Sequence, residues 1–112
     1  MSELTAKKCA PCEGGVDPLT REQAQTLMQQ LHADWRLAED GRSIRREWKF
    51  RNFFHTMSFV NAVAHIANAE GHHPDLEVGY DVCRMKFTTH AIGGLSENDF
   101  ICAAKVDQLP KT

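Results

Sequence analysis

The sequence predicts an α+β domain: a four-stranded antiparallel sheet with helices on one face, in the order α-β-β-α-β-β-α. Three observations lead to this prediction. The chain has 112 residues, the length of one ordinary domain. Two pairs of segments alternate apolar with charged residues, which is typical of antiparallel strands with one solvated face. Segments with helical spacing stand before, between and after these pairs.

Composition limits the function classes. Apolar residues make up 42% and charged residues 25% of the chain, as in globular proteins. A net charge of −2 argues against a nucleic-acid binder that relies on electrostatics. No apolar run approaches the roughly 20 residues of a membrane helix, and the N-terminus lacks the apolar stretch of a signal peptide. We therefore expect a cytoplasmic protein with no nucleic-acid or membrane partner.

Pro and Gly recur within residues 1–18, and these residues are expected to form a tail ahead of a domain at 19–112. Thr20 and Gln23 form a capping-box pattern, so a short helix is predicted from there to about His32. Its apolar face consists of Ala24, Leu27, Met28 and Leu31.

The first strand pair is predicted as a hairpin. A short strand around Trp35 to Leu37 is followed by Asp40-Gly41, a strong turn signal. The next run then alternates, and its inner side consists of Ile44, Arg46, Trp48 and Phe50. Arg46 is the one charged residue on that inner side.

Residues 52–70 give the strongest helix signal, with Asn52 as the N-cap. One apolar face consists of Phe53, Met57, Val60, Ala64 and Ala67; a second consists of His55, Phe59, Ala62 and Ile66. The only continuous polar stripe is Ser58, Asn61, His65 and Asn68. A helix that is apolar on most of its circumference needs cover on more than one side. We therefore predict that one side packs on the sheet and the other on a second subunit.

The second strand pair alternates over residues 76–80 and 82–90, with a tight connection near Tyr80-Asp81. After a Gly-Gly turn, Ser96 is predicted to cap a final helix whose first turn is acidic, as the helix dipole favours. Pro110 follows the end of that helix.

Four cysteines need an interpretation. Cys9 and Cys12 form a CxxC motif, whereas Cys83 and Cys102 stand alone in periodic segments. No second ligand pair at zinc spacing follows the motif, and it does not lie between a strand and a helix as in thioredoxin-like proteins. The simpler interpretation is a turn in the tail and two small buried hydrophobic residues, with a metal or redox role for the motif as the alternative.

Three histidines are expected to meet at one end of the sheet. Gly71 is predicted to end the long helix, and Pro74 favours an extended His73. Antiparallel pairing through a tight turn brings His90 roughly opposite His72 and His73. Imidazole suits proton transfer near neutral pH. From the residues alone, an acid–base site, a zinc site and capping or surface roles are all open.

The chain contains H-H-P at 72–74, then Tyr80, His90, and Asp99 within L-S-E-N-D, and it has D-W-R-L at 34–37. This set resembles the signature of the pterin-4a-carbinolamine dehydratases, over about residues 20–108. The resemblance implies dehydration of 4a-hydroxytetrahydropterin to quinonoid dihydropterin, which recycles the cofactor of aromatic amino acid hydroxylases. It implies no metal, nucleotide or redox cofactor.

The resemblance also implies roles for individual residues. His72 and His90 are expected to be the acid/base pair, with His73 mainly holding the pterin. Asp99 orients a site histidine or, alternatively, only serves the first turn of a helix, and Trp35 walls the pocket or lies in the core. The full set of expected substrate-binding residues is Gly71, Thr88, Thr89, Ala91, Asp99 and Trp35.

Dimers or tetramers assembled through the long helix and the sheet edges are a further implication, and an aromatic amino acid hydroxylase is a candidate physical partner. Animal members of the family also act as dimerisation cofactors of a homeodomain transcription factor through the same helix. The main alternative function is therefore a protein-binding module that uses the apolar long helix. A metal-dependent hydratase is a third hypothesis.

Overall fold

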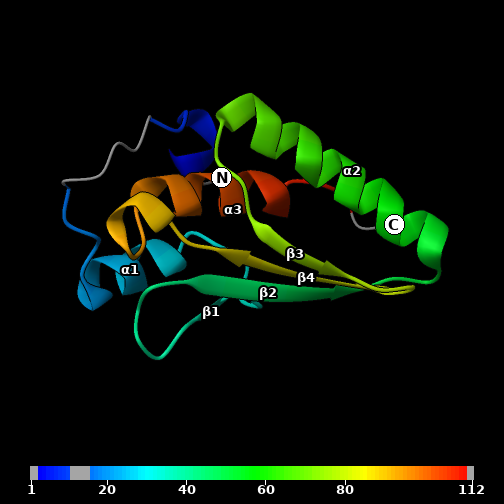
Figure 1. Ribbon diagram of the computed structural model, residues 1–112, viewed down its shortest axis with the longest axis horizontal. Helices are drawn as coiled ribbons and strands as arrows, with labels where there is room; N and C mark the ends of the chain where they lie inside the picture. Colours follow the sequence, from blue (N-terminus) through cyan, green and yellow to red (C-terminus); the bar gives the residue numbers. More distant parts are fainter. Residues whose placement is uncertain (1–2, 11–15, 111–112) are drawn as a thin grey trace.

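The computed structural model describes residues 3–10 and 16–110. It has a four-stranded antiparallel sheet with the main helices on one face (Figure 1), so the predicted fold class and element order are confirmed. The elements are η1 (Glu3–Ala6), α1 (Arg21–Met28), β1 (Arg36–Leu37), β2 (Ile44–Lys49), α2 (Phe53–Glu70), β3 (Asp75–Val78), β4 (Val82–Phe87), η2 (His90–Ile92) and α3 (Glu97–Asp107). No helix in this part of the chain is long and apolar enough to cross a membrane.

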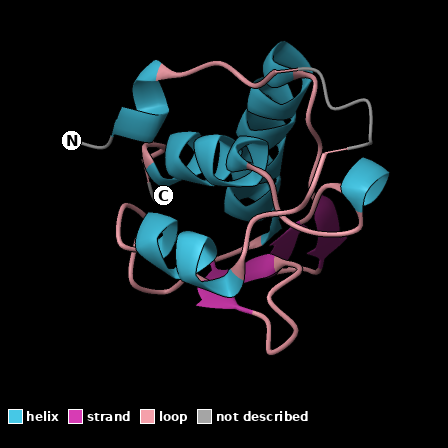
Figure 2. Cartoon of the chain, turned by 90° about the vertical axis from the view of Figure 1, so that its left-hand side faces the viewer, coloured by secondary structure: helices cyan, strands magenta, loops and turns pink. Residues whose placement is uncertain are grey.

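The strand order is β1-β2-β4-β3, so the last strand lies beside β2 and leaves β3 at an edge. Ile44 pairs with Phe87 and Trp48 with Cys83, and all four side chains are buried on the helical side of the sheet. α3 occupies the middle of the helical layer (Figure 2), and most of its residues are buried. The sheet therefore has one covered face and one open, charged face.

The helix caps follow from local sequence. Thr20 and Gln23 form the predicted capping box, and Asn52 accepts a hydrogen bond from the backbone N–H of His55 across 3.0 Å. Gly71 ends α2 with φ of 66°, a left-handed conformation that glycine adopts without a steric penalty. α1 is shorter than predicted, since it ends at Met28 and tight turns follow.

The buried side of α2 coincides with neither of the two predicted apolar faces. Its buried stripe consists of Thr56, Phe59, Val63 and Ala67. On a helical projection, this stripe lies between the two predicted faces and opposite the exposed polar stripe. The two faces are thus the margins of one broad apolar surface, with Phe59 and Ala67 belonging to its centre. The sheet and α3 cover that centre, while Phe53 and Phe54 are exposed.

A polar network explains the charged residue on the inner side of β2. Arg46 Nη1 donates to Asp107 Oδ1 across 2.8 Å, and its guanidinium lies 4.5 Å from the ring centroid of Trp48. The same carboxylate oxygen accepts the indole N–H of Trp35 at 2.8 Å. Because its charge is paired, Arg46 is accommodated at the margin of the core.

Part of the predicted N-terminal tail packs on the domain. Leu4, in η1, is only 1% exposed, and Ala10 is held by Asn98 of α3 through two hydrogen bonds. One leucine among polar residues produces no periodic signal, so no local pattern predicts this packing. Cys12 lies outside the described residues, whereas Cys83 and Cys102 are buried as expected.

Candidate active site

A cavity of about 490 Å³ opens where α2 ends and where the chain leaves β4 for η2. All three histidines singled out in the sequence line this cavity. The complete lining consists of Cys9, Ala10, Glu70, Gly71, His72, His73, Thr88, Thr89, His90, Ala91 and Asn98. Residues far apart in the chain are therefore brought to one ligand-sized space.

The end of α2 sets the direction of the two adjacent histidines. Gly71 turns the chain, and the N–H of His72 still donates to the carbonyl of Ala67 across 3.2 Å. Pro74 then leads directly into β3, where Asp75 pairs with Lys86 of β4. The edge strand thus starts beside the end of β4, which places His72 and His73 near the segment that carries His90.

His72 is the most constrained of the three imidazoles. Its Nε2 lies 2.6 Å from Oδ1 of Asp99, its side chain is 12% exposed, and its ring stacks on Phe87 at 6.0 Å between centroids. The hydrogen bond to the Asp99 carboxylate raises the pKa of His72, against the opposing effect of burial. With Nε2 turned to Asp99, Nδ1 is the nitrogen left for exchange with a ligand.

Asp99 is fully buried and does not line the cavity. It therefore lies on the side of His72 that faces away from the cavity. Its Oδ2 accepts hydrogen bonds from Thr89 Oγ1 at 2.8 Å and from the backbone N–H of Ser96 at 3.0 Å. The carboxylate therefore caps α3 and orients an imidazole at the same time. Both interpretations of Asp99 offered by the sequence describe this geometry.

His73 and His90 are exposed. The His90 side chain is 80% exposed, and its Nε2 lies 3.9 Å from Oδ2 of Asp75. Within the described residues, His73 makes no hydrogen bond or ion pair. Both rings are thus accessible to a ligand in the cavity.

The expected substrate-binding residues divide into two groups, because four of them line the cavity, whereas Asp99 and Trp35 do not. Gly71, Thr88, Thr89 and Ala91 line the cavity as expected. The Thr88 hydroxyl donates to the carbonyl of Arg42 across 2.6 Å, so it is already engaged.

Trp35 does not line the cavity, and the pocket-wall expectation for it is not met. It is 2% exposed and packs edge-on against Trp48 at 5.7 Å between centroids. Its indole N–H is used by Asp107. Trp35 is a core residue, the alternative that the sequence left open.

Four lining residues were not expected from the sequence: Cys9, Ala10, Glu70 and Asn98. Glu70 accepts the backbone N–H of Cys9 at 2.9 Å and the Lys105 ammonium at 2.7 Å. The hydrogen bond from Lys105 lowers the pKa of Glu70. The contacts between the N-terminal segment and α3 join residues 88 positions apart, and no local pattern signals such a contact.

Among the described residues, no group of three or more His, Cys, Asp or Glu side chains is arranged to hold a metal ion. The three-histidine zinc site considered from the sequence is therefore not formed by these side chains.

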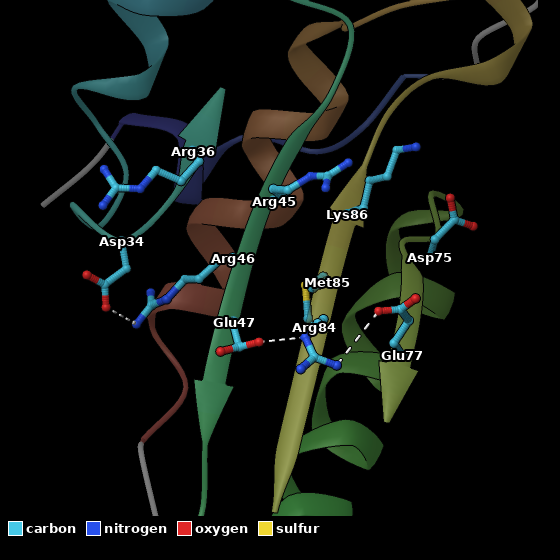
Figure 3. Close-up of a pocket in the computed structure, with 10 residues that line it drawn as sticks. All are labelled: Asp34, Arg36, Arg45, Arg46, Glu47, Asp75, Glu77, Arg84, Met85 and Lys86. Carbon is cyan, nitrogen blue, oxygen red and sulfur yellow. Dashed lines mark hydrogen bonds and ion pairs between the residues drawn. The ribbon is translucent and has the colours of Figure 1, made fainter. Parts of the chain in front are cut away.

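A second hollow, of about 650 Å³, lies on the open face of the sheet (Figure 3). Ion pairs from Arg84 to Glu47 at 2.6 Å and to Glu77 at 3.9 Å cross it. Arg36, Arg45 and Lys86 form a cationic row on neighbouring strands. No histidine lines this hollow, so the cavity at the end of α2 is the better site for proton transfer near neutral pH.

Comparison with known proteins shows the family of the chain. The sequence model of the family described as pterin 4 alpha carbinolamine dehydratase matches residues 17–109. The chain belongs to this family. A relative from Nitrosomonas europaea, named "Putative pterin-4-alpha-carbinolamine dehydratase", is 57% identical over 110 residues, which cover 98% of this chain and 96% of the relative. A relative of the same name from Legionella pneumophila is 56% identical over 108 residues, covering 96% of each chain.

Solved structures show the same pterin dehydratase fold. The crystal structure of a transcriptional coactivator/pterin dehydratase from Brucella melitensis matches with a TM-score of 0.74 and 27% identity, covering 80% of this chain and 95% of that one. A pterin dehydratase-like protein described as a RuBisCO assembly factor in the alpha-carboxysome matches with a TM-score of 0.58 and 22% identity, covering 68% of this chain and 88% of that one. This second likeness concerns the fold alone.

Proposed function

We propose that this pterin dehydratase family member converts 4a-hydroxytetrahydropterin to quinonoid dihydropterin by histidine general acid/base catalysis. The observation that carries the proposal is the cavity shared by three imidazoles, one of them paired with a buried carboxylate. The product is the form that a reductase returns to the cofactor of aromatic amino acid hydroxylases. The same proposal includes a cytoplasmic location for the protein and physical association with an aromatic amino acid hydroxylase.

The reaction needs one proton donor and one proton acceptor. The hydroxyl on C4a leaves as water after it is protonated, the electron pair on N5 forms the new C=N bond, and N5 loses its proton to a base. No electrons are exchanged with an external group, so the step balances without a redox partner. Each well-placed acid or base contributes about 10²–10⁴-fold.

The environments of the histidines suggest how the two roles divide. Asp99 favours the protonated form of His72, which suits the donation of a proton to the leaving hydroxyl. His90, exposed on the opposite segment of the cavity rim, takes the proton from N5. His73 lines the cavity between the end of α2 and β3 and holds the pterin.

The test of this function is a direct rate measurement. Purified protein is mixed with synthetic 4a-hydroxytetrahydropterin in the presence of EDTA, and dehydration is followed by the change in pterin absorbance. We expect a rate well above the spontaneous rate, linear in protein concentration and insensitive to EDTA. A rate equal to that without protein would contradict the proposal, and a rate abolished by EDTA would favour the metal-dependent hydratase.

We also propose that the chain associates with itself through α2. The alternative protein-binding role would use the same helix. The supporting observation is an exposed aromatic group at the start of α2 and the β3–β4 turn. Phe54 is 73% exposed and Tyr80 66% exposed, and Phe53 stacks on Tyr80 at 6.4 Å between centroids. Large exposed apolar groups of this kind mark interaction surfaces. The Brucella melitensis neighbour is itself described as a transcriptional coactivator as well as a pterin dehydratase.

Light scattering at micromolar concentration tests the association. We expect a dimer or tetramer that shifts toward smaller species in Phe54→Ser, with Asn68→Ala, on the exposed polar stripe at the other end of α2, as the matched control. A monomeric wild-type protein would contradict self-association. In a stable monomer that turns over the pterin, α2 would not be used for self-association. The absence of any co-purifying partner would then count against the protein-binding role of α2.

A further inference from the structure

Two thiols meet at the wall of the candidate active site. The sulfur atoms of Cys9 and Cys102 lie 3.5 Å apart, although 93 positions separate the two residues in the chain. Both cysteines are free. A disulfide bond requires about 2.05 Å between the sulfurs, so an approach of roughly 1.5 Å is sufficient.

The backbone around Cys9 is held in place, so this proximity is a feature of the fold. The N–H of Cys9 donates to Glu70 at 2.9 Å, and the thiol lies 3.6 Å from the carbonyl of Asn98. The next residue, Ala10, makes two hydrogen bonds to the Asn98 side chain. Earlier in the segment, Leu4 is anchored in the core. Four hydrogen bonds and the burial of Leu4 therefore keep the Cys9 thiol in place.

The two thiols differ in access. Cys9 is partly exposed and lines the cavity, so a small oxidant can reach it. Cys102 is fully buried, and its sulfur lies 3.8 Å from the carbonyl of His72. An accessible thiol beside a protected second thiol is the arrangement in which oxidation of the first is resolved as a disulfide.

The electrostatics of the pair follow the same asymmetry. The hydrogen bond from Cys102 lowers the pKa of Cys9, and the nearby His72 acts in the same direction. The pKa of Cys102 is raised by that hydrogen bond and by burial. The thiolate is the reactive form of cysteine, so Cys9 is the member of the pair that reacts with an oxidant.

We propose that Cys9 and Cys102 are a reversible dithiol–disulfide site, which places an oxidation-sensitive group on the wall of the cavity. With a peroxide as oxidant, the Cys9 thiolate attacks one oxygen, the O–O bond breaks, and the products are a sulfenic acid and, after protonation, water. The Cys102 thiol then attacks the Cys9 sulfur and displaces a second water. The two thiols together lose two electrons and two protons. The disulfide fixes the N-terminal segment to α3 beside His72, and its formation does not depend on the proposed pterin chemistry.

Peptide mapping of the full chain tests this site. The protein is treated with hydrogen peroxide at neutral pH, its remaining thiols are alkylated, and it is cleaved with trypsin. We expect peptide 9–21, alkylated only at Cys12, and unmodified peptide 87–105 to be joined in a species about 2 Da lighter than their sum, and dithiothreitol to separate them. Because peptide 9–21 also contains Cys12, the experiment is repeated with single substitutions.

The matched variants decide which cysteine takes part. The joined species should persist in Cys12→Ser and in Cys83→Ser, and disappear in Cys9→Ser and in Cys102→Ala. A species that persists in Cys9→Ser but not in Cys12→Ser would overturn the assignment. So would oxidation that leaves peptides 9–21 and 87–105 unjoined in the wild-type protein, whether Cys9 then forms a disulfide with Cys12 or a sulfinic acid. If Cys102→Ala does not fold, the wild-type and Cys12→Ser maps give the answer by themselves.

Discussion

Oδ1 of Asp99, at the start of α3, lies 2.6 Å from Nε2 of His72, just beyond the end of α2. The other carboxylate oxygen is held by Thr89 and Ser96, so neither the acid nor the ring can rotate freely. Carboxylates that hold one nitrogen of an imidazole fix the orientation and basicity of the other. His72 therefore faces the cavity with a defined nitrogen.

Asp99→Asn is expected to lower the pKa of His72, because the amide cannot carry the negative charge that favours the imidazolium ion. An NMR titration of the His72 ring should show a midpoint below that of the wild-type protein. The pH profile of dehydration should move to lower pH with it. An unchanged His72 midpoint in a folded variant would show that another group sets this pKa.

The same pair predicts how stability depends on pH. The folded-state pKa of His72 is raised, so the pairing contributes fully below the unfolded pKa of about 6.5. This contribution is lost as pH rises through the folded-state pKa. Urea unfolding should therefore show a decrease in the free energy of unfolding across that range in the wild-type protein, and a weaker decrease in Asp99→Asn. Parallel pH curves for the two proteins would contradict the linkage.

Trp35→Phe tests the placement of that residue in the core. The change removes the indole N–H that Asp107 accepts at 2.8 Å, while Arg46 still neutralises the carboxylate. We expect a loss of about 1 kcal/mol in the free energy of unfolding, measured with urea. The KM for the pterin should stay unchanged. A raised KM without a loss of stability would instead support a pocket-wall role.

Gly71 is expected to resist substitution for conformational reasons. Its φ is 66°, and no atom within 4 Å would meet an added Cβ. Gly71→Ala should therefore lower the free energy of unfolding by about 1–2 kcal/mol through the left-handed backbone alone. Gly71→Asn should cost less, since asparagine tolerates this conformation. Equal stability of all three proteins, by urea unfolding, would mean that α2 ends in another way.

Local sequence predicted most of the fold because its signals act over a few residues. The capping box at Thr20, the helix cap at Ser96, the hairpin turn at Gly41 and the end of α2 at Gly71 all occur where the pattern indicated. The centre of the buried face of α2 was misplaced, because a broad apolar surface does not show which part the sheet will cover.

The site was predicted in part for the same reason. His72, His73 and His90 could be placed together because one tight turn and an antiparallel register connect them. The docking of Cys9 and Ala10 on α3 could not, since that contact depends on tertiary packing across nearly the whole chain. A tryptophan such as Trp35 is suited to either a pocket wall or a core position, and only its neighbours in the folded structure decide between them.

The most direct test of the proposed mechanism compares the dehydration rates of His72→Ala and His90→Ala with those of the wild-type protein and of His65→Ala. His65 is exposed on the polar side of α2 and does not line the cavity, so its variant serves as the matched control. We expect kcat/KM to fall about 10²–10⁴-fold in each of the first two variants and to stay unchanged in the control, with circular dichroism confirming that all are folded. Wild-type turnover in folded His72→Ala and His90→Ala would contradict the account.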